Sequence, residues 1–289
     1  MIALLGLLAM ALTTSSSELK MLSYHRLQVS ERFDLSGILK IDAGIKSRFN
    51  AEGDFLLLND KSSVIYQGKI IGSEVVLSAL IDLRTLGVKG DFDLEGIDQF
   101  DSSLYILNEA QESVIVLAGP EAKDVRVIQS KPSLSKIFPA YRLSSKFGLE
   151  GIAVNSKGIL LAKEMMPLAL FQLDSLGKAK IYERNQLGSQ TDLKFQKDSL
   201  YILDREGRCV WKTALPLKQK EFCYSFAQAL KHVELDYWAR DSKDRHQPQW
   251  GTAEALELDG DAFIVGLDNN GQSLKTRTDT RPVIVFLKP

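Results

Sequence analysis

The stretch Leu94-Glu95-Gly96-Ile97, followed by the polar turn Asp101-Ser102-Ser103 and the apolar run Leu104-Tyr105-Ile106-Leu107, recurs along the chain. A second clear copy begins at Leu149-Glu150-Gly151-Ile152. The other three copies are degenerate and begin at Leu35, Thr191 and Ala253. Neighbouring copies are about 40 to 65 residues apart, which is the length of a four-stranded propeller blade. The repeat therefore predicts an all-β fold, a single five-bladed β-propeller.

Each copy has the same order of short β-rich segments. An inner strand is followed by a polar turn, a second apolar strand that ends in a charged loop, and then a third strand. The first copy differs by a longer connection between its first and second strands. The last copy ends after its third strand at 283–286, and the segment Met21–Leu27 precedes the first copy. We expect this N-terminal segment to be the fourth strand of the last blade, so that the propeller domain covers 18–289 and its seam has no free sheet edge.

The N-terminal segment resembles a targeting leader. Ile2 to Leu12 is apolar, and Thr13 to Ser17 is small and polar. The run is too short to span a bilayer as a helix. Ala9-Met10-Ala11 fits a small-x-small cleavage site, although no Lys or Arg precedes the apolar run. We expect 1–17 to be a signal or a disordered leader, no transmembrane span, and a periplasmic or secreted mature protein; a wrongly chosen start codon is the alternative.

The overall composition is that of an ordinary globular protein. The chain has 289 residues, of which 45% are hydrophobic and 25% charged. Its 36 Lys and Arg residues nearly cancel 37 Asp and Glu residues, which leaves a net charge of -1. Nucleic-acid binding needs a concentrated basic field, so we expect no nucleic-acid partner.

Two cysteines, Cys209 and Cys223, flank what the sequence predicts to be a hairpin loop. Strands on both sides of such a loop would bring the two thiols nearly opposite each other. One disulfide and two reduced, half-buried thiols are equally consistent with this pattern. Without a neighbouring His or a third Cys, a zinc site is not expected.

One position in each copy converges on the propeller axis. These positions are Ser36, Glu95, Glu150, Thr191 and Glu254. Carboxylates on one axis repel one another unless they are protonated, paired with Arg or Lys, or bound to a cation. Several hard oxygen ligands without His or Cys favour one calcium ion in the channel. The alternative is that each side chain caps its own inner strand and bonds the neighbouring blade.

The charged loops after the second strands share a rim with these positions, because an inner strand begins where its partner strand ends. Long connections also reach this rim. The rim residues expected to contact a ligand are Arg142, Glu109, Glu164, Arg205 and Asp268. The three histidines are scattered, so no nucleophile–base pair is expected.

The segment Phe147-Gly148-Leu149-Glu150-Gly151-Ile152-Ala153, with Lys163-Glu164-Met165-Met166-Pro167 after it, resembles the SdiA-regulated, phytase-like (esterase-like) β-propeller family. In that family a Gly-Phe-Glu-Gly-Leu-Ala stretch precedes a Glu-Lys-x-Pro stretch. The resemblance extends over about residues 30 to 287 through short, partly degenerate motifs of the kind expected in propeller repeats. It implies an exported bacterial propeller with bound calcium, and no settled activity.

More distantly, the chain is similar to the calcium-activated nucleotidases (apyrases), which are five-bladed propellers with a Ser, Glu, Glu, Ser, Glu order round a central calcium. The five axial positions here match that order with one Ser-to-Thr change, at Thr191. The substrate-binding residues of the nucleotidases have no counterpart that can be aligned here. A shared fold does not imply a shared activity.

Three functions are consistent with these features. The first is a calcium-containing rim that binds a small or polymeric ligand or a partner protein. The second is a calcium-dependent phosphoester or phosphoanhydride hydrolase, in which Arg142 or Arg205 takes the charge of a phosphate-ester substrate. The third is a structural propeller without metal.

Overall fold

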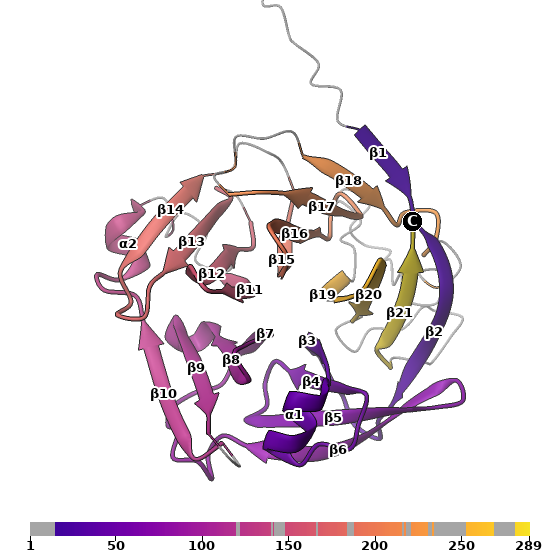
Figure 1. Ribbon diagram of the computed structural model, residues 1–289, viewed down its shortest axis with the longest axis horizontal. Coiled ribbons are helices and arrows are strands. Elements are labelled where there is room, and N and C mark those ends of the chain that lie inside the picture. Colours follow the sequence, from indigo (N-terminus) through magenta and orange to yellow (C-terminus); the bar gives the residue numbers. More distant parts are fainter. Residues whose placement is uncertain are drawn as a thin grey trace, which may run out of the picture.

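Short strands make up most of the structure, a computed structural model that describes residues 15–119, 122–139, 141, 148–165, 167–183, 188–215, 217, 221–230, 233, 253–268 and 281–289. Five strands lie innermost, and each contacts two others, so that they close a ring in the order in which they occur along the chain (Figure 1). The inner strands are β3 (Leu35–Lys40), β7 (Leu94–Phe100), β11 (Leu149–Asn155), β15 (Gln190–Gln196) and β19 (Ala253–Asp259). These are the segments in which the repeat predicts inner strands.

Antiparallel strands follow each inner strand outward, as in a β-propeller (Figure 1). After β3 come β4 (Phe55–Asn59), β5 (Val64–Ile71) and β6 (Glu74–Asp82); after β7 come β8 (Ser103–Asn108), β9 (Ser113–Ala118) and β10 (Asp124–Gln129). After β11 come β12 (Gly158–Lys163), β13 (Ala169–Leu173) and β14 (Ala179–Glu183); after β15 come β16 (Ser199–Asp204), β17 (Cys209–Thr213) and β18 (Phe222–Ser225); after β19 come β20 (Ala262–Leu267) and β21 (Val283–Lys288). The second strand of each copy is largely buried, as are the third strands β9, β13 and β21, whereas most residues of β5 are partly exposed.

The chain closes its ring with a strand from its N-terminal side. Strand β2 (Lys20–Gln28) pairs antiparallel with β21, which confirms the pairing predicted for Met21–Leu27. The same strand also pairs parallel with β6, and Arg281 forms a 2.9 Å ion pair with Glu74 at the tip of the β5–β6 hairpin. One continuous sheet of eight strands, from β19 to β3, therefore crosses the seam.

A further strand precedes the ring. Strand β1 (Ser15–Glu18) pairs parallel with β18 and includes the last three residues of the expected leader, 1–17. The backbone N–H of Leu19 then donates to the carbonyl of Ser225 at 2.7 Å, and the Leu19 side chain is buried. Residues from Ser15 onward thus belong to the folded unit in this structure.

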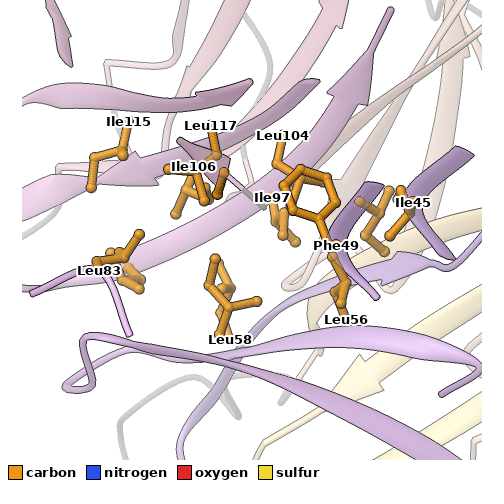
Figure 2. Packing of buried hydrophobic residues seen from close by; sticks show 14 of the residues in the cluster. Ile45, Phe49, Leu56, Leu58, Leu83, Ile97, Leu104, Ile106, Ile115 and Leu117 are labelled. Atoms are coloured by element: carbon orange, nitrogen blue, oxygen red, sulfur yellow. The ribbon is translucent and has the colours of Figure 1, made fainter. Parts of the chain in front are cut away.

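The core lies between the apolar faces of neighbouring sheets. Figure 2 shows one such cluster, in which Leu58 of β4 faces Ile106 of β8 and Leu117 of β9. Burial of these side chains is the main stabilising term for the contact between the two sheets.

Helix α1 (Ala43–Phe49) occupies the longer connection between β3 and β4. The sequence analysis did not predict this helix. It begins at Asp42, whose Oδ1 accepts the backbone N–H of Ile45 at 2.8 Å, and ends at Asn50 in the left-handed conformation. Ile45 and Phe49 extend the cluster of Figure 2. Two further short helical segments are η1 (Glu109–Gln111) and α2 (Leu134–Ile137). None of the helices in the described residues is long and apolar enough to cross a bilayer.

Strands β17 and β18 are joined by a disulfide between Cys209 and Cys223, whose Cα atoms lie 5.7 Å apart. The structure therefore has the bonded form of the two alternatives. The 14-residue separation closes a short loop in the unfolded chain.

Replacing both cysteines with serine is expected to lower the free energy of unfolding by about 2 kcal/mol, because the unfolded chain regains the entropy of that loop. Urea denaturation of the oxidised parent and of the double variant measures the difference. Adding reductant should destabilise the parent and leave the double variant unchanged. Equal stability of the oxidised parent and the double variant would contradict a stabilising disulfide.

Candidate metal centre

Each inner strand has a register shift at the residue that the repeat places on the axis. In β7, Leu94 pairs with Asn108 and Gly96 pairs with Leu107, so Glu95 is left out of the ladder. The same shift skips Ser36, Glu150, Thr191 and Glu254. An extra residue in one strand bends the strand and re-aims its side chain. Each of the five predicted axial positions is therefore the extra residue of a β-bulge. The spacing of the repeat alone does not reveal these bulges.

The two hydroxyl residues of the set bridge neighbouring inner strands. Ser36 Oγ donates to the carbonyl of Leu94, and Thr191 Oγ1 donates to the carbonyl of Ala253 at 2.8 Å. Both side chains are buried. These contacts match the alternative in which such side chains bond the neighbouring blade. A role for Ser36 and Thr191 as metal ligands stays a prediction.

Three glutamates from neighbouring sheets meet at the rim. Carboxylate oxygens of Glu95, Glu109 and Glu150 all lie within 4.8 Å of one another. Burial, followed by the nearby carboxylates, raises the pKa of Glu95 and of Glu150 well above the usual value. Within the described part of the chain, no lysine or arginine forms an ion pair with any of the three. A divalent cation would relieve this repulsion.

A second acidic group shares Glu95 with the first. Oxygens of Asp60, Asp93 and Glu95 also lie within 4.8 Å of one another. Lys61 Nζ lies 2.5 Å from Asp93 Oδ1 and 3.2 Å from Asp60 Oδ2, so these two carboxylates are paired with a lysine ammonium. Asp60 Oδ1 is buried and has no hydrogen-bond partner among the described residues. We call these five carboxylates, together with Lys61, the rim cluster; its acidic members are Asp60, Asp93, Glu95, Glu109 and Glu150.

Arg205 provides a positive charge that acts on Glu150. Its Nη1 lies 2.5 Å from Glu254 Oε1, and its Nη2 is paired with Glu164 Oε1. Burial lowers the pKa of Arg205, but Glu254, Glu164 and Glu150 outweigh that effect and raise it above its usual value. Two residues expected at a calcium site or ligand rim, Glu254 and Arg205, are thus paired with each other.

The remaining rim predictions have different outcomes. Glu109 belongs to the rim cluster and Glu164 to the Arg205 pair. Asp268 is buried just after β20. The pKa of Arg32 is raised mainly by its hydrogen bond with Asp34, and the charges of Asp268 and Asp60 raise it further. Arg142 lies outside the described residues.

The sequence analysis did not assign Asp60, Lys61 or Asp93 to the site. A local signal was present, since Asp93 directly precedes the Leu94-Glu95-Gly96 motif and Asp60 lies in the charged loop of the preceding copy. The backbone N–H of Leu94 donates to the carbonyl of Asp60 at 2.8 Å, which brings the two loops together. The sequence does not show that contact because its partners are about 30 residues apart and belong to different sheets.

We expect Glu109 to make the stability of the metal-free protein depend on pH. Burial and then the Asp93 carboxylate raise its pKa to about 7, compared with about 4.3 in an unfolded chain. A raised pKa means that the stability contributed by neutral Glu109 is complete below about pH 4 and is lost as pH rises towards 7. Between pH 5 and 8 the parent should lose about 2 kcal/mol more than Glu109→Gln, allowing for partial exposure of the side chain.

Urea denaturation in chelator across this pH range measures that difference. Glu183→Gln, a change at an exposed glutamate of β14, should follow the parent. If the free energy of unfolding changed with pH in the same way for the parent and Glu109→Gln, Glu109 would not be the source of the pH dependence.

Comparisons with known proteins show the fold and no family. No protein-family model matches the sequence, and a search of curated proteins finds no match. The structure matches solved β-propeller proteins. Glutaminyl cyclase from Myxococcus xanthus has a TM-score of 0.57 at 11% identity, over 95% of this chain and 98% of that one. Aldose sugar dehydrogenase from Streptomyces coelicolor, in its PQQ-bound form, has a TM-score of 0.47 at 10% identity, over 93% and 98%. At these identities the cyclase match supports the fold alone.

Proposed function

We propose that this chain is an exported five-bladed β-propeller that binds one calcium ion at the rim cluster and uses that rim to bind a ligand or a partner protein. The observation that carries the proposal is the meeting of Glu95, Glu109 and Glu150, with oxygens within 4.8 Å of one another. Such a group of partly buried carboxylates is costly without a cation.

The blade number rests on the inner strands. Five of them close a ring through mutual contacts, and each has a β-bulge at its repeat position. Assigning β2 to the last unit gives every unit four strands. This arrangement agrees with the resemblance to SdiA-regulated, phytase-like propellers.

The choice of calcium rests on the chemistry of the donors. The rim cluster offers carboxylate oxygens from two inner strands and the neighbouring loops and no imidazole or thiolate, and calcium takes six to eight such hard ligands in flexible geometry. The buried Asp60 Oδ1 without a hydrogen-bond partner is a further oxygen available on the same rim. Glu95, Glu109 and Glu150 would hold the ion, with Asp60 and Asp93 next to it. When bound, calcium would supply positive charge and open coordination positions to a ligand.

Binding is favoured over phosphate-ester hydrolysis by the state of Arg205. Both terminal nitrogens of this side chain are held by carboxylates, Glu164 and Glu254. A guanidinium held in this way is poorly placed to take the charge of a phosphoryl group. The ligand class is therefore defined by the cation rather than by Arg205, while Arg142 lies outside the described residues.

Export is supported by the disulfide between Cys209 and Cys223, since such bonds persist mainly outside the cytosol. The apolar leader favours the same compartment. Recovery of the full chain in a reduced form, from the cytoplasm alone of a bacterial host, would contradict export.

Calorimetric titration of calcium into chelator-treated protein tests the metal site. The parent should bind one equivalent, and Glu150→Gln should weaken binding by roughly 10-fold or more, since even indirect partners of metal sites contribute that much. Glu183→Gln should bind like the parent because Glu183 is exposed on β14. At about 100 times its Kd, calcium should also raise the Tm by roughly 5 to 10 °C.

The absence of both calcium heat and a Tm increase would refute the metal site and leave the rim cluster as a structural feature. If calcium binds, a screen with nucleoside phosphates, phytate and nitrophenyl esters separates the two functions. Calcium-dependent turnover that is lost in Glu150→Gln would establish a hydrolase and contradict the binding role.

A further inference from the structure

Exposed apolar side chains gather at the seam of the ring, where β2 pairs with β6 of the β5–β6 hairpin (Figure 1). We call this surface the seam face; its apolar members are Leu22, Tyr24, Ile71 and Val76. These side chains are between 36% and 61% exposed. The other large exposed apolar side chains of the described residues are scattered over separate elements. Apolar side chains that cluster on a surface mark interaction sites, whereas single ones are ordinary.

The strand register places these side chains on one face of the sheet. Arg26 of β2 lies opposite Glu74 of β6, and Glu74 lies opposite Ile71 of β5. Residues directly opposite each other in a sheet share a face, and so does every second residue along a strand. Tyr24 and Val76 are each two residues from a member of this row, so they lie on the same face as Ile71.

A cavity of about 510 Å³ opens on the seam face. Its volume is in the range that small-molecule sites have in proteins. The cavity is lined by three apolar and three ionisable side chains: Met21, Leu22, Tyr24, Arg26, Glu74 and Arg281. The backbone N–H of Arg26 donates to the carbonyl of Ser73 at 3.1 Å, which fixes the tip of the hairpin against β2. The two walls of the cavity are therefore held in place by the backbone.

The ionisable side chains of the seam face carry more positive than negative charge. Arg281 Nη1 forms a 2.9 Å ion pair with Glu74 Oε1, and this contact uses one of the five N–H donors of the guanidinium. The guanidinium carbon of Arg26 lies 5.6 Å from the ring centroid of Tyr24, which keeps the cation beside the apolar wall. Lys69 is exposed on the same face, opposite Val76. Among the described residues, three cations thus share this face with one carboxylate, which favours an anionic ligand.

We propose that the seam face is a binding site for a single-chain amphiphilic anion, such as a fatty-acid carboxylate. The head group lies at Arg26 and Arg281, whose guanidinium forks suit a planar carboxylate. The tail lies against the apolar members of the seam face and is removed from water there. A second copy of this chain, docked through the same face, would bring like charges together. The site shares no residue with the rim cluster, so it does not depend on calcium.

The test is a calorimetric titration of laurate into the full-length protein in chelator, which also prevents precipitation of calcium laurate. Dodecyltrimethylammonium, with a chain of similar length and the opposite charge, is titrated in parallel. Laurate should bind one equivalent with a submillimolar Kd, and the cationic amphiphile should not bind. Leu22→Ser should weaken laurate binding roughly 5-fold by removing apolar contact, and Arg26→Gln roughly 10-fold by removing a charged donor.

Two matched controls carry the same substitutions at exposed positions of other sheets. Leu176→Ser, in the turn after β13, and Arg126→Gln, on β10, should bind laurate like the parent. Because Leu22 is 61% exposed, Leu22→Ser should keep the Tm of the parent to within about 2 °C. Should Arg26→Gln fail to fold, Leu22→Ser and its control decide.

Saturable laurate binding with this dependence on head group and variants supports the proposal. No binding of laurate, equal binding of both amphiphiles, or equal effects of the seam variants and their controls overturns it. Two further measurements identify other occupants. Cosedimentation with phosphatidylglycerol vesicles, by a protein that does not bind laurate, would assign the face to a bilayer and overturn the proposal. So would a monomer–dimer equilibrium that Leu22→Ser abolishes and laurate does not change, because the occupant would then be a second copy.

Discussion

Arg205→Met is expected to lower the Tm of the metal-free protein by roughly 10 °C, because it leaves Glu164 and Glu254 buried without their counter-charge. Removing one partner of a buried ion pair typically costs about 3 to 5 kcal/mol. Arg205 is 13% exposed, whereas Glu164 is 4% and Glu254 13% exposed, so water cannot fully replace the guanidinium. Glu150 lies close enough to both glutamates for their charges to raise its pKa, which adds to the repulsion.

Thermal unfolding in chelator measures this effect, and Arg126→Met is the matched control because Arg126 is exposed on the edge strand β10. Lowering the pH should restore part of the Tm in Arg205→Met as the glutamates become protonated. A loss no larger than that of Arg126→Met would show that the Arg205 pairs contribute little, as exposed ion pairs do.

Gly151→Ala is expected to lower the free energy of unfolding by about 3 kcal/mol, at the upper end of the range for overpacking. A Cβ at Gly151 would lie 2.7 Å from Asp192 Cα and 2.9 Å from Asp192 C, both atoms of the neighbouring inner-strand backbone. Backbone atoms of a closed ring cannot move apart at one point without disturbing the rest. The methyl group would therefore push β11 away from β15.

Gly37→Ala is the matched comparison, because Gly37 occupies the same position of β3. The Cβ there would meet Leu58 Cδ1 at 2.9 Å, the far end of a side chain that can change rotamer. We expect a loss of about 1 kcal/mol. Urea denaturation of both variants gives the two values, and similar losses would contradict the close approach of β11 and β15.

These two glycines show how far a repeat can be interpreted from sequence. The same position holds Gly in three copies, Asp192 in β15 and Ala255 in β19. The structure shows that a Cβ is tolerated at two of the five positions and would meet backbone at Gly151.

The strand pattern of the fold could be predicted because it is local. Alternating apolar runs and turn residues mark the strands within each copy, and the Leu-Glu-Gly-Ile repeat marks the inner ones. The N-terminal strand of the seam could also be placed, since the last copy lacked a partner for β21. Helix α1 was missed because it is only 7 residues long and is stabilised by packing Ile45 and Phe49 against the neighbouring sheet.

The site was predicted only in part. Spacing placed Glu95 and Glu150 on one axis, and the structure brings their carboxylates close to that of Glu109, while their role as metal ligands stays a prediction. Spacing did not show that Arg205 pairs with Glu254, or that Lys194 Nζ lies 3.7 Å from Asp98 Oδ1. Both contacts join strands that are far apart in sequence.

The sequence by itself thus determined the strand repeat, the ring of axial positions and the oxygen-rich character of the rim, because each depends on residue type at a regular spacing. The tertiary structure decided which charges meet. Whether a carboxylate such as Glu150 or Glu254 faces another carboxylate or a guanidinium depends on side-chain reach across neighbouring sheets. At such short range an ångström or two changes an electrostatic energy by about 1 to 2 kcal/mol, and the repeat spacing carries no information at that scale.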